Sequence, residues 1–370
     1  MSDLGKKSFD RFTIIIPTYN KPDYLKRILT YFLSFKKRIN IIVLDGSDEV
    51  FPDISVYEDK IEYLHTPKLD PFERSKLALN KINTPYVLVC ADDDFVVPDA
   101  VIKVIDFLDN NPDYASGQGV SYSFYYKNHF IEKYSPFWDM NNRKINDNTP
   151  SERIINIMSN WILIAYSVFR TEVFKVINEN IYFGLKVFRY NTALTELLYN
   201  IYTIIEGKHI VLPLLYSARE VAFNSSGYIT AFLEEVVYKK KYRQDYQNFL
   251  QFTSEYLSKE EKIDIEEARR VIKNAVYCFI CIFLPGFYHI PLPRKLKNSL
   301  RCMVFVLWMG RSVISILRKI KLDGIFIRIM HKIFRRNDKP LSPDTQDIEN
   351  WNKIEEYIKK FDFLYKKQSA

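Results

Sequence analysis

The chain has 370 residues, of which 53 are Lys or Arg, 45 are Asp or Glu, 47% are hydrophobic and 15% are aromatic. This apolar content excludes a disordered chain and a collagen-like repeat, and the length fits one large domain or one domain with an appendage. Four cysteines in a chain of this length exclude a disulfide framework and favour a reducing compartment, the cytoplasm.

The first 110 residues alternate between short apolar runs rich in β-branched side chains and segments whose apolar residues recur at helical spacing. We expect strands over residues 12–16, 40–44, 61–64 and 85–90, and helices over residues 24–36, 72–81 and 98–108. This alternation with short connections indicates an α/β fold with a doubly wound, mostly parallel sheet. In such sheets, ligands bind beyond the carboxyl ends of the strands.

The pattern changes after about residue 115. We expect a hairpin and then two helices, over residues 119–133, 151–159 and 192–205. From about residue 232 the sequence predicts helices almost throughout, interrupted at Pro285 and Gly286. We therefore expect an α/β domain over residues 1–228 and a C-terminal α-helical appendage over residues 229–370.

Polar residues follow three of the predicted strands, at Pro17-Thr-Tyr-Asn20, Asp45-Gly-Ser47 and Asp92-Asp-Asp94. Because the carboxyl ends of parallel strands meet at one edge, we expect these residues to converge. Adjacent carboxylates repel one another, and a divalent cation relieves that repulsion. Oxygen ligands favour Mg²⁺ or Mn²⁺, which also bind phosphate oxygens, so this edge would hold a phosphorylated donor. The alternative is a solvated acidic turn that precedes the helix at residue 98.

Three segments carry a resemblance to a known family. They are residues 12–27 (FTIIIPTYNKPDYLKR), 41–47 (IIVLDGS) and 87–100 (VLVCADDDFVVPDA). They resemble the opening strand, the aspartate turn and the DxD strand of family 2 glycosyltransferases, and the resemblance covers roughly residues 11–225. It implies a GT-A fold, with a nucleotide-sugar half at about 11–115 and an acceptor half at about 116–228.

The resemblance also implies which residues bind the donor. Pro17, Thr18, Tyr19 and Asn20 would border the nucleotide, with Thr18 and Tyr19 lining its pocket, and Asp45 would hold the base. Arg74, on the helix before the DxD strand, lies where the family often places a pyrophosphate or base contact. An ordinary surface position for Arg74 stays open.

The acidic triplet allows two registers against the family motif. If Pro98 is the anchor, Asp93 takes the metal-ligand position with Asp94 beside it, and Ala91 replaces the first aspartate. If Asp92 and Asp94 are the two ends of the motif, a literal DxD is restored. We prefer Asp93 and Asp94 as the metal site, for Mg²⁺ or Mn²⁺, with Asp92 facing the ribose or the diphosphate.

An inverting transfer needs a base that deprotonates the acceptor hydroxyl. The family supplies it from an acidic pair that opens a helix, followed by a turn, a strand, a proline and a basic residue. Residues 195–213 have this layout, with Arg219 beyond them. One member of the pair is acidic here, so Glu196 is the predicted base, and an ordinary helix carboxylate is the alternative.

The positive charge is concentrated in one segment. Residues 294–339 hold 13 Lys or Arg against 2 Asp or Glu, a net charge of +11, whereas the whole chain has +8. Apolar and aromatic residues recur among these cations, which suggests an amphipathic helix on an anionic membrane surface. A core helix with a solvated basic face is the alternative. Nucleic acid is not the expected partner, because the apolar content is far above what phosphate binding needs.

These expectations combine into one function. The chain would be a metal-dependent, inverting glycosyltransferase that moves a sugar from a nucleotide-diphosphate sugar, with uridine as the base, to a glycan or lipid-linked acceptor. It would serve cell-surface polysaccharide synthesis at the inner face of the cytoplasmic membrane. Two alternatives stay open, namely a nucleotidyltransferase-like nucleotide-sugar enzyme and a GT-A domain that has lost catalysis and acts as a scaffold.

Overall fold

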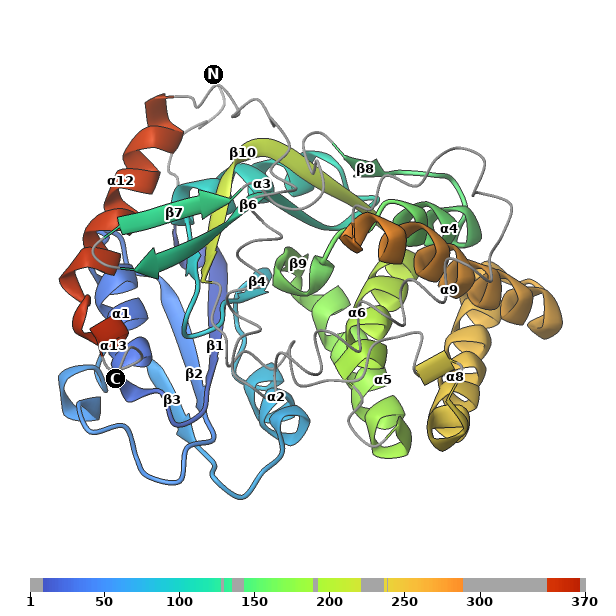
Figure 1. Cartoon of the computed structure of the whole chain (residues 1–370), viewed down its shortest axis with the longest axis horizontal. Helices are drawn as coiled ribbons and strands as arrows, with labels where there is room; N and C mark the ends of the chain where they lie inside the picture. Colours follow the sequence, from blue (N-terminus) through green and yellow to red (C-terminus); the bar gives the residue numbers. More distant parts are fainter. Residues whose placement is uncertain are drawn as a thin grey trace.

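The computed structural model describes residues 9–127, 130–134, 143–188, 192–220, 236–237, 239–288 and 345–366 (Figure 1). The strands are β1 (Phe12–Thr18), β2 (Asn40–Asp45), β3 (Glu62–His65), β4 (Tyr86–Val89), β5 (Phe95–Val96), β6 (Tyr114–Lys127), β7 (Phe130–Tyr134), β8 (Lys144–Ile145), β9 (Val168–Arg170) and β10 (Lys208–Glu220). The α-helices are α1 (Pro22–Leu33), α2 (Pro71–Leu79), α3 (Pro98–Asn110), α4 (Pro150–Ser159), α5 (Thr171–Phe188), α6 (Thr192–Glu206), α8 (Arg243–Glu261), α9 (Ile265–Tyr288), α12 (Thr345–Lys360) and α13 (Phe363–Lys366). Short 3₁₀ turns lie at Phe9–Arg11, Ile54–Val56, Ile164–Tyr166 and Lys240–Tyr242.

The described strands form one mixed sheet in the order β3-β2-β1-β4-β9-β6-β10-β5, with β7 beside β6 and β8 beside β10. The first four strands in this order are parallel to one another, as are β6 and β10. The short strand β9 runs antiparallel to both β4 and β6 and joins these two parallel parts. The predicted α/β fold is confirmed, and β9 makes the sheet more mixed than the expected doubly wound arrangement.

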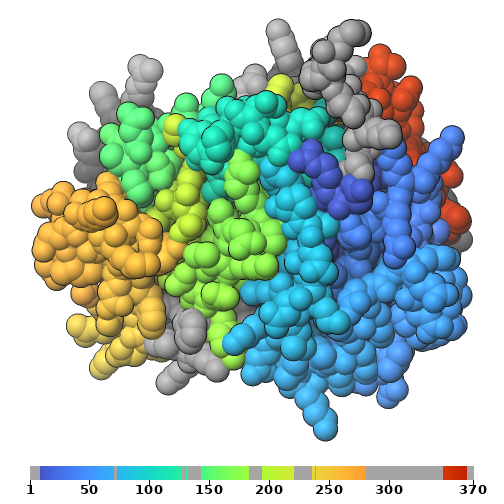
Figure 2. All heavy atoms as spheres, turned by 180° about the vertical axis from the view of Figure 1, so that it is seen from behind, coloured from blue at the N-terminus to red at the C-terminus, as the bar shows by residue number. Residues whose placement is uncertain are grey.

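Alternate residues of β1 point into two separate hydrophobic clusters, because side chains of a strand alternate between the faces of a sheet. Ile14 and Ile16 lie in a cluster with residues of α1, α3 and α12. Ile15 lies in the other cluster, with residues of α2, α4, α5, α6, α8 and α9. In Figure 2, which views the molecule from behind, the N-terminal residues (blue) lie on one side and the α8–α9 pair (orange) lies on the other. The continuous apolar run of β1 is therefore buried on both faces.

The C-terminal helices pack on different parts of the body. Helices α8 and α9 pack against α4, α5 and α6, whereas α12 returns to α1 and β10. Trp351, Ile354, Tyr357 and Ile358 bury the apolar face of α12 in the same cluster as β1. Figure 1 shows α12 beside α1. The predicted boundary at residues 228–229 and the basic segment 294–339 lie outside the described residues, so both stay predictions.

The expected break at Pro285 and Gly286 is wrong, because α9 runs from Ile265 to Tyr288. Proline removes one helical hydrogen bond, and packing of α9 against α4 and α8 sustains the helix around that loss. In the part of the chain that the structure describes, no helix is both long enough and apolar enough to span a bilayer.

Candidate active site

The predicted donor-binding residues converge at one edge of the sheet, as the parallel strands require. Thr18 at the end of β1 pairs in register with Asp45 at the end of β2. The adjacent strand β4 leads into Asp92 through Cys90, whose backbone N–H donates to the carbonyl of Ile15 on β1 over 2.9 Å. Pro17 and Tyr19 are exposed at this edge, whereas Thr18 is buried. Sequence reasoning therefore placed the edge correctly.

Asn20 ties the end of β1 to the end of β2. It has a left-handed backbone, with φ of 52°, which asparagine adopts more readily than most residues. Its backbone N–H donates to Ser47 Oγ over 2.8 Å, and its side-chain amide exchanges hydrogen bonds with Asp48. Asn20 thus fixes the loop that follows β1, and these contacts give it a structural role beside the nucleotide-bordering role expected from the sequence.

Asp45 is buried and accepts two hydrogen bonds from the protein. The backbone N–H of Ser47 donates to Oδ1 over 2.8 Å, and Tyr63 Oη on β3 donates to Oδ2 over 2.5 Å. The Tyr63 ring stacks parallel to His65, with 6.4 Å between ring centroids, and His65 Nε2 lies 2.9 Å from the carbonyl oxygen of Ser47. Burial and the bond to Asp45 raise the pKa of Tyr63. A flat aromatic wall therefore stands beside the Asp45 carboxylate, and sequence reasoning missed Tyr63.

Arg74 joins the same edge from α2 and is buried, not on the surface. Its guanidinium lies over Gly46, where an added Cβ would come within 1.6 Å of Arg74 Nη1. Burial lowers the pKa of Arg74, and the charges of Asp45 and Asp70 oppose that change. Gly46 therefore leaves open the space that the Arg74 guanidinium occupies at this edge of the sheet.

Asp92 and Asp93 face one ammonium group. Thr18 Oγ1 donates to Asp92 Oδ2 over 2.7 Å. Lys21 Nζ lies 2.8 Å from Asp93 Oδ2 and 3.6 Å from Asp92 Oδ1. Burial raises the pKa of Asp92 to about 6, and Lys21 opposes that rise. Lys21 directly follows the predicted loop 17–20, but its residue type gave no signal of this pairing.

Asp94 has different partners from those of the predicted metal site. Its Oδ1 accepts the backbone N–H of Glu220 over 2.9 Å, and its Oδ2 lies 3.3 Å from Arg219 Nε. Burial raises the pKa of Asp94, while Arg219 lowers it. Both oxygens therefore contact β10, and the expectation that Asp94 holds a cation beside Asp93 stays a prediction.

Arg27, on α1, contacts the acidic turn, which is formed by Asp92, Asp93 and Asp94. Its side chain is fully buried, with Nη2 donating to the carbonyl oxygen of Asp93 and Nη1 donating to Glu220 Oε2, both over 2.8 Å. Tyr24 Oη also donates to Glu220, over 3.2 Å. Sequence reasoning missed Arg27, although Tyr24, Arg27 and Tyr31 share one side of α1 at helical spacing.

The donor set fits a divalent cation in part. No group of three or more His, Cys, Asp or Glu side chains is placed to hold a metal ion within the described ranges. However, Mg²⁺ at nucleotide sites is usually bound by one or two carboxylates together with phosphate oxygens. The Lys21 ammonium marks a position where Asp92 and Asp93 already converge on one positive charge. Asp92 and Asp93 therefore fit such a cation better than Asp94, whose oxygens contact β10.

Glu196 lies in the first turns of α6 and keeps an exposed side chain. The surrounding protein desolvates its carboxylate and raises its pKa, while Arg219 lowers it. Arg219 in turn packs its guanidinium over the Tyr166 ring, 4.5 Å from the centroid. Arg219 thus acts electrostatically on both Asp94 and Glu196, which links the acidic turn to the predicted base.

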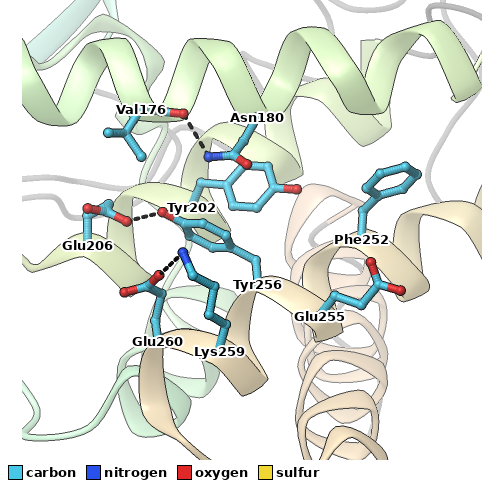
Figure 3. A pocket seen from close by; sticks show the side chains of 9 residues that line it. All are labelled: Val176, Asn180, Tyr202, Glu206, Phe252, Glu255, Tyr256, Lys259 and Glu260. Carbon is cyan, nitrogen blue, oxygen red and sulfur yellow. Dashed lines mark hydrogen bonds and ion pairs between the residues drawn. The ribbon is translucent and has the colours of Figure 1, made fainter.

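A separate groove of about 480 Å³ lies at the other end of α6 (Figure 3). It lies among α5, α6 and α8, and its lining includes Tyr202, Glu206 and Tyr256. The hydroxyl of Tyr256 donates to Glu206, and Lys259 pairs with Glu260 over 2.9 Å. None of the predicted site residues lines this groove, so it is not part of the candidate active site.

The chain was compared with known proteins. Residues 13–171 match the family model of glycosyl transferase family 2. The crystal structure of S. aureus TarS 1-349 in complex with UDP-GlcNAc matches with a TM-score of 0.50 and 14% identity, over 97% of this chain and 92% of that chain. The complex of TarS 1-349 with UDP has a TM-score of 0.49 and 13% identity, over 78% and 77% of the two chains. No match was found among curated proteins.

The family match covers β1 to β9, and so includes the acidic turn and the edge at which the predicted donor residues meet. The fold of the UDP-GlcNAc complex extends the similarity over nearly the whole chain. The predictions of the family, of the GT-A fold and of an enzyme are confirmed. Residues 13–171 form a glycosyl transferase family 2 domain.

Proposed function

We propose that the donor is a nucleotide-diphosphate sugar with uridine as its base. The observation that carries this proposal is the convergence of Asp45, Arg74 and the Asp92–Asp93 pair at one sheet edge. Asp45 offers carboxylate oxygens to the base N–H, beside the Tyr63 ring, and Arg74 offers a positive charge. The TarS structures with UDP and UDP-GlcNAc, which share the fold, support this choice of donor.

We further propose that Asp92 and Asp93 hold Mg²⁺ or Mn²⁺ together with the donor diphosphate. When bound, the cation would neutralise charge that develops on the leaving diphosphate. Thr18 orients Asp92 through its hydroxyl, and Arg27 holds the backbone of Asp93. These contacts keep both carboxylates at the donor edge.

Glu196 is the proposed general base. Its carboxylate would accept the proton of the acceptor hydroxyl while that oxygen attacks the anomeric carbon from the face opposite the diphosphate, which inverts the configuration. Desolvation raises the pKa of Glu196, which makes its carboxylate a stronger base than an ordinary exposed glutamate. The nearby charge of Arg219 favours the ionised form that can act as a base.

We propose a glycan or lipid-linked glycan as the acceptor, in cell-surface polysaccharide synthesis. The basic segment 294–339 supports this proposal, because its charge and apolar content suit the anionic inner face of the cytoplasmic membrane. The test replaces this segment with a neutral linker and measures sedimentation with anionic vesicles. Unchanged vesicle binding would contradict the proposed membrane contact.

Nucleotide binding is the first experiment for the donor site. Thermal shifts would be recorded with UDP, ADP, GDP and CDP, with and without Mn²⁺, for the wild type, Asp45→Asn and Asp93→Ala. A ligand that binds the folded state raises the melting temperature by mass action. We expect a shift with UDP that Asp45→Asn loses and whose Mn²⁺ dependence Asp93→Ala loses. Asp59→Ala, at an exposed position outside the proposed donor site, is the control. No shift with any nucleotide would overturn the proposal.

A further inference from the structure

Lys21 occupies the space where the proposed cation would contact the protein. Its Nζ lies 2.8 Å from Asp93 Oδ2 and 3.6 Å from Asp92 Oδ1. An ammonium group and a divalent cation cannot share these oxygens, because their like charges repel at such distances. Any cation that binds Asp92 and Asp93 must therefore first displace Lys21.

Of these three groups, Lys21 is the one that is free to move. Asp92 is held by Thr18 Oγ1, and the backbone of Asp93 is held by the buried Arg27. The side chains of Asp92 and Asp93 are 7% and 14% exposed, whereas that of Lys21 is 36% exposed. Lys21 also has four rotatable bonds in its side chain. It can swing toward solvent or toward a ligand while the carboxylates stay in place.

We propose that Lys21 makes cation binding depend on the donor. This inference rests on the nucleotide-diphosphate donor proposed above. Without the donor, Lys21 neutralises the Asp92–Asp93 pair and competes with the cation. When the donor is bound, its diphosphate offers Lys21 a new anionic partner at the same edge, and the two carboxylates become available. The donor and the cation therefore each strengthen the binding of the other, as linkage requires.

The size of the effect follows from the exposure of Lys21. An ammonium group that is 36% exposed is a modest competitor, and its loss should tighten donor-free cation binding about two- to tenfold. The chain offers a matched comparison in Lys26, on the same helix. Lys26 Nζ lies 2.8 Å from Asp53 Oδ2, with both side chains about as exposed as Lys21, but away from the acidic turn.

The test measures Mn²⁺ binding to the full chain from the signal of free Mn²⁺ in electron paramagnetic resonance, without nucleotide and with saturating UDP. The variants are Lys21→Gln, Lys21→Arg and Lys26→Gln. We expect Lys21→Gln to bind Mn²⁺ more tightly without UDP and to gain less affinity when UDP is added. Lys21→Arg keeps the positive charge, so its Mn²⁺ binding should still depend on UDP. Lys26→Gln should behave as the wild type.

Two results would overturn the inference while leaving the donor proposal intact. The first is donor-free Mn²⁺ affinity in Lys21→Gln that equals or falls below that of the wild type. The second is UDP binding without any Mn²⁺ binding in the wild type. Circular dichroism of each variant confirms folding. Failure of the wild type to bind UDP, measured separately by calorimetry without metal, would overturn the donor proposal and this inference together.

Discussion

Arg27 and Glu220 form an ion pair with 2.8 Å between Nη1 and Oε2, and their side chains are 0% and 4% exposed. The pair joins α1 to the end of β10, two elements that are 193 residues apart in the sequence. Removal of one partner would leave a buried charge without compensation, which is costly in the low dielectric of a protein interior. Arg27 also binds the carbonyl oxygen of Asp93, and the backbone N–H of Glu220 binds Asp94. The pair therefore links the two elements, α1 and β10, that hold these aspartates in place.

Replacement of Arg27 by Met should destabilise the fold by about 3–5 kcal/mol, because Glu220 would stay buried without its counter-charge. Urea denaturation gives the free energy of unfolding. The matched control is Lys81→Met, which breaks the pair between Lys81 and Glu62, 2.7 Å apart but about half exposed. Its effect should stay below about 1 kcal/mol. Equal losses in the two variants would contradict this account.

Glu196→Gln should lower kcat by about 10²- to 10⁴-fold, because the amide cannot accept the proton of the acceptor. UDP affinity should stay unchanged, since Glu196 is the proposed base for the acceptor and not one of the proposed nucleotide contacts. Glu179→Gln, at an exposed position of α5, is the control. Steady-state kinetics and calorimetry separate the two effects, and a variant that keeps most of its activity would remove Glu196 from the mechanism.

The pH profile should report the environment of Glu196. Desolvation raises its pKa and Arg219 opposes that change, so kcat/KM should fall as the pH drops through this raised pKa. Arg219→Met removes the opposing charge, and the acidic limb should then move to higher pH. An acidic limb that stays in place in Arg219→Met would contradict the proposed coupling.

Gly46→Ala should weaken UDP binding as much as Arg74→Ala does, since the added Cβ displaces the guanidinium of Arg74. If Arg74 contacts the diphosphate, each change should cost about 1.5–3 kcal/mol of binding free energy. The double variant should be no worse than either single variant, because both changes remove the same contact. Isothermal titration calorimetry measures all four proteins, and additive losses would show that Gly46 acts by another route.

His209 should make the fold sensitive to mild acid. It is fully buried on β10, with Nδ1 2.8 Å from Ser116 Oγ, and burial lowers its pKa to about 3. Between this value and about 6.5 the unfolded chain binds a proton that the folded chain does not, so stability falls as the pH falls. From pH 7.5 to 5.5 this one group should remove about 1.4 kcal/mol of the free energy of unfolding. In His209→Phe the loss over this interval should be smaller by that amount, which urea denaturation at the two pH values would reveal.

The convergence of Thr18, Asp45 and Asp92 at one sheet edge was predictable because local patterns determine it. The continuous apolar runs of β1, β2 and β4 mark strands buried on both faces, and parallel pairing brings their polar ends together. The partners of Asp94 were not predictable in this way, because Arg219 lies 125 residues further along the chain. Neither local spacing nor residue type indicates which of three adjacent aspartates turns toward such a distant strand.

Tyr63 and Lys21 escaped prediction for a different reason. Both are common residue types at half-buried positions, and their importance comes from geometry that the fold creates. Tyr63 reaches Asp45 from the neighbouring strand β3, and Lys21 reaches the acidic turn from the start of α1. Such contacts depend on side-chain direction across adjacent elements, which the period of the hydrophobic pattern does not encode.

The packing of α12 has a consequence for cleavage of the chain. The helix is held by the burial of Trp351, Ile354, Tyr357 and Ile358 against the body that contains β1, and not solely by the peptide chain that leads to it. A protease cut within residues 289–344 would therefore yield two fragments that stay associated as one particle. The C-terminal piece would leave that particle when denaturant exposes its apolar face, and not at the moment of cleavage.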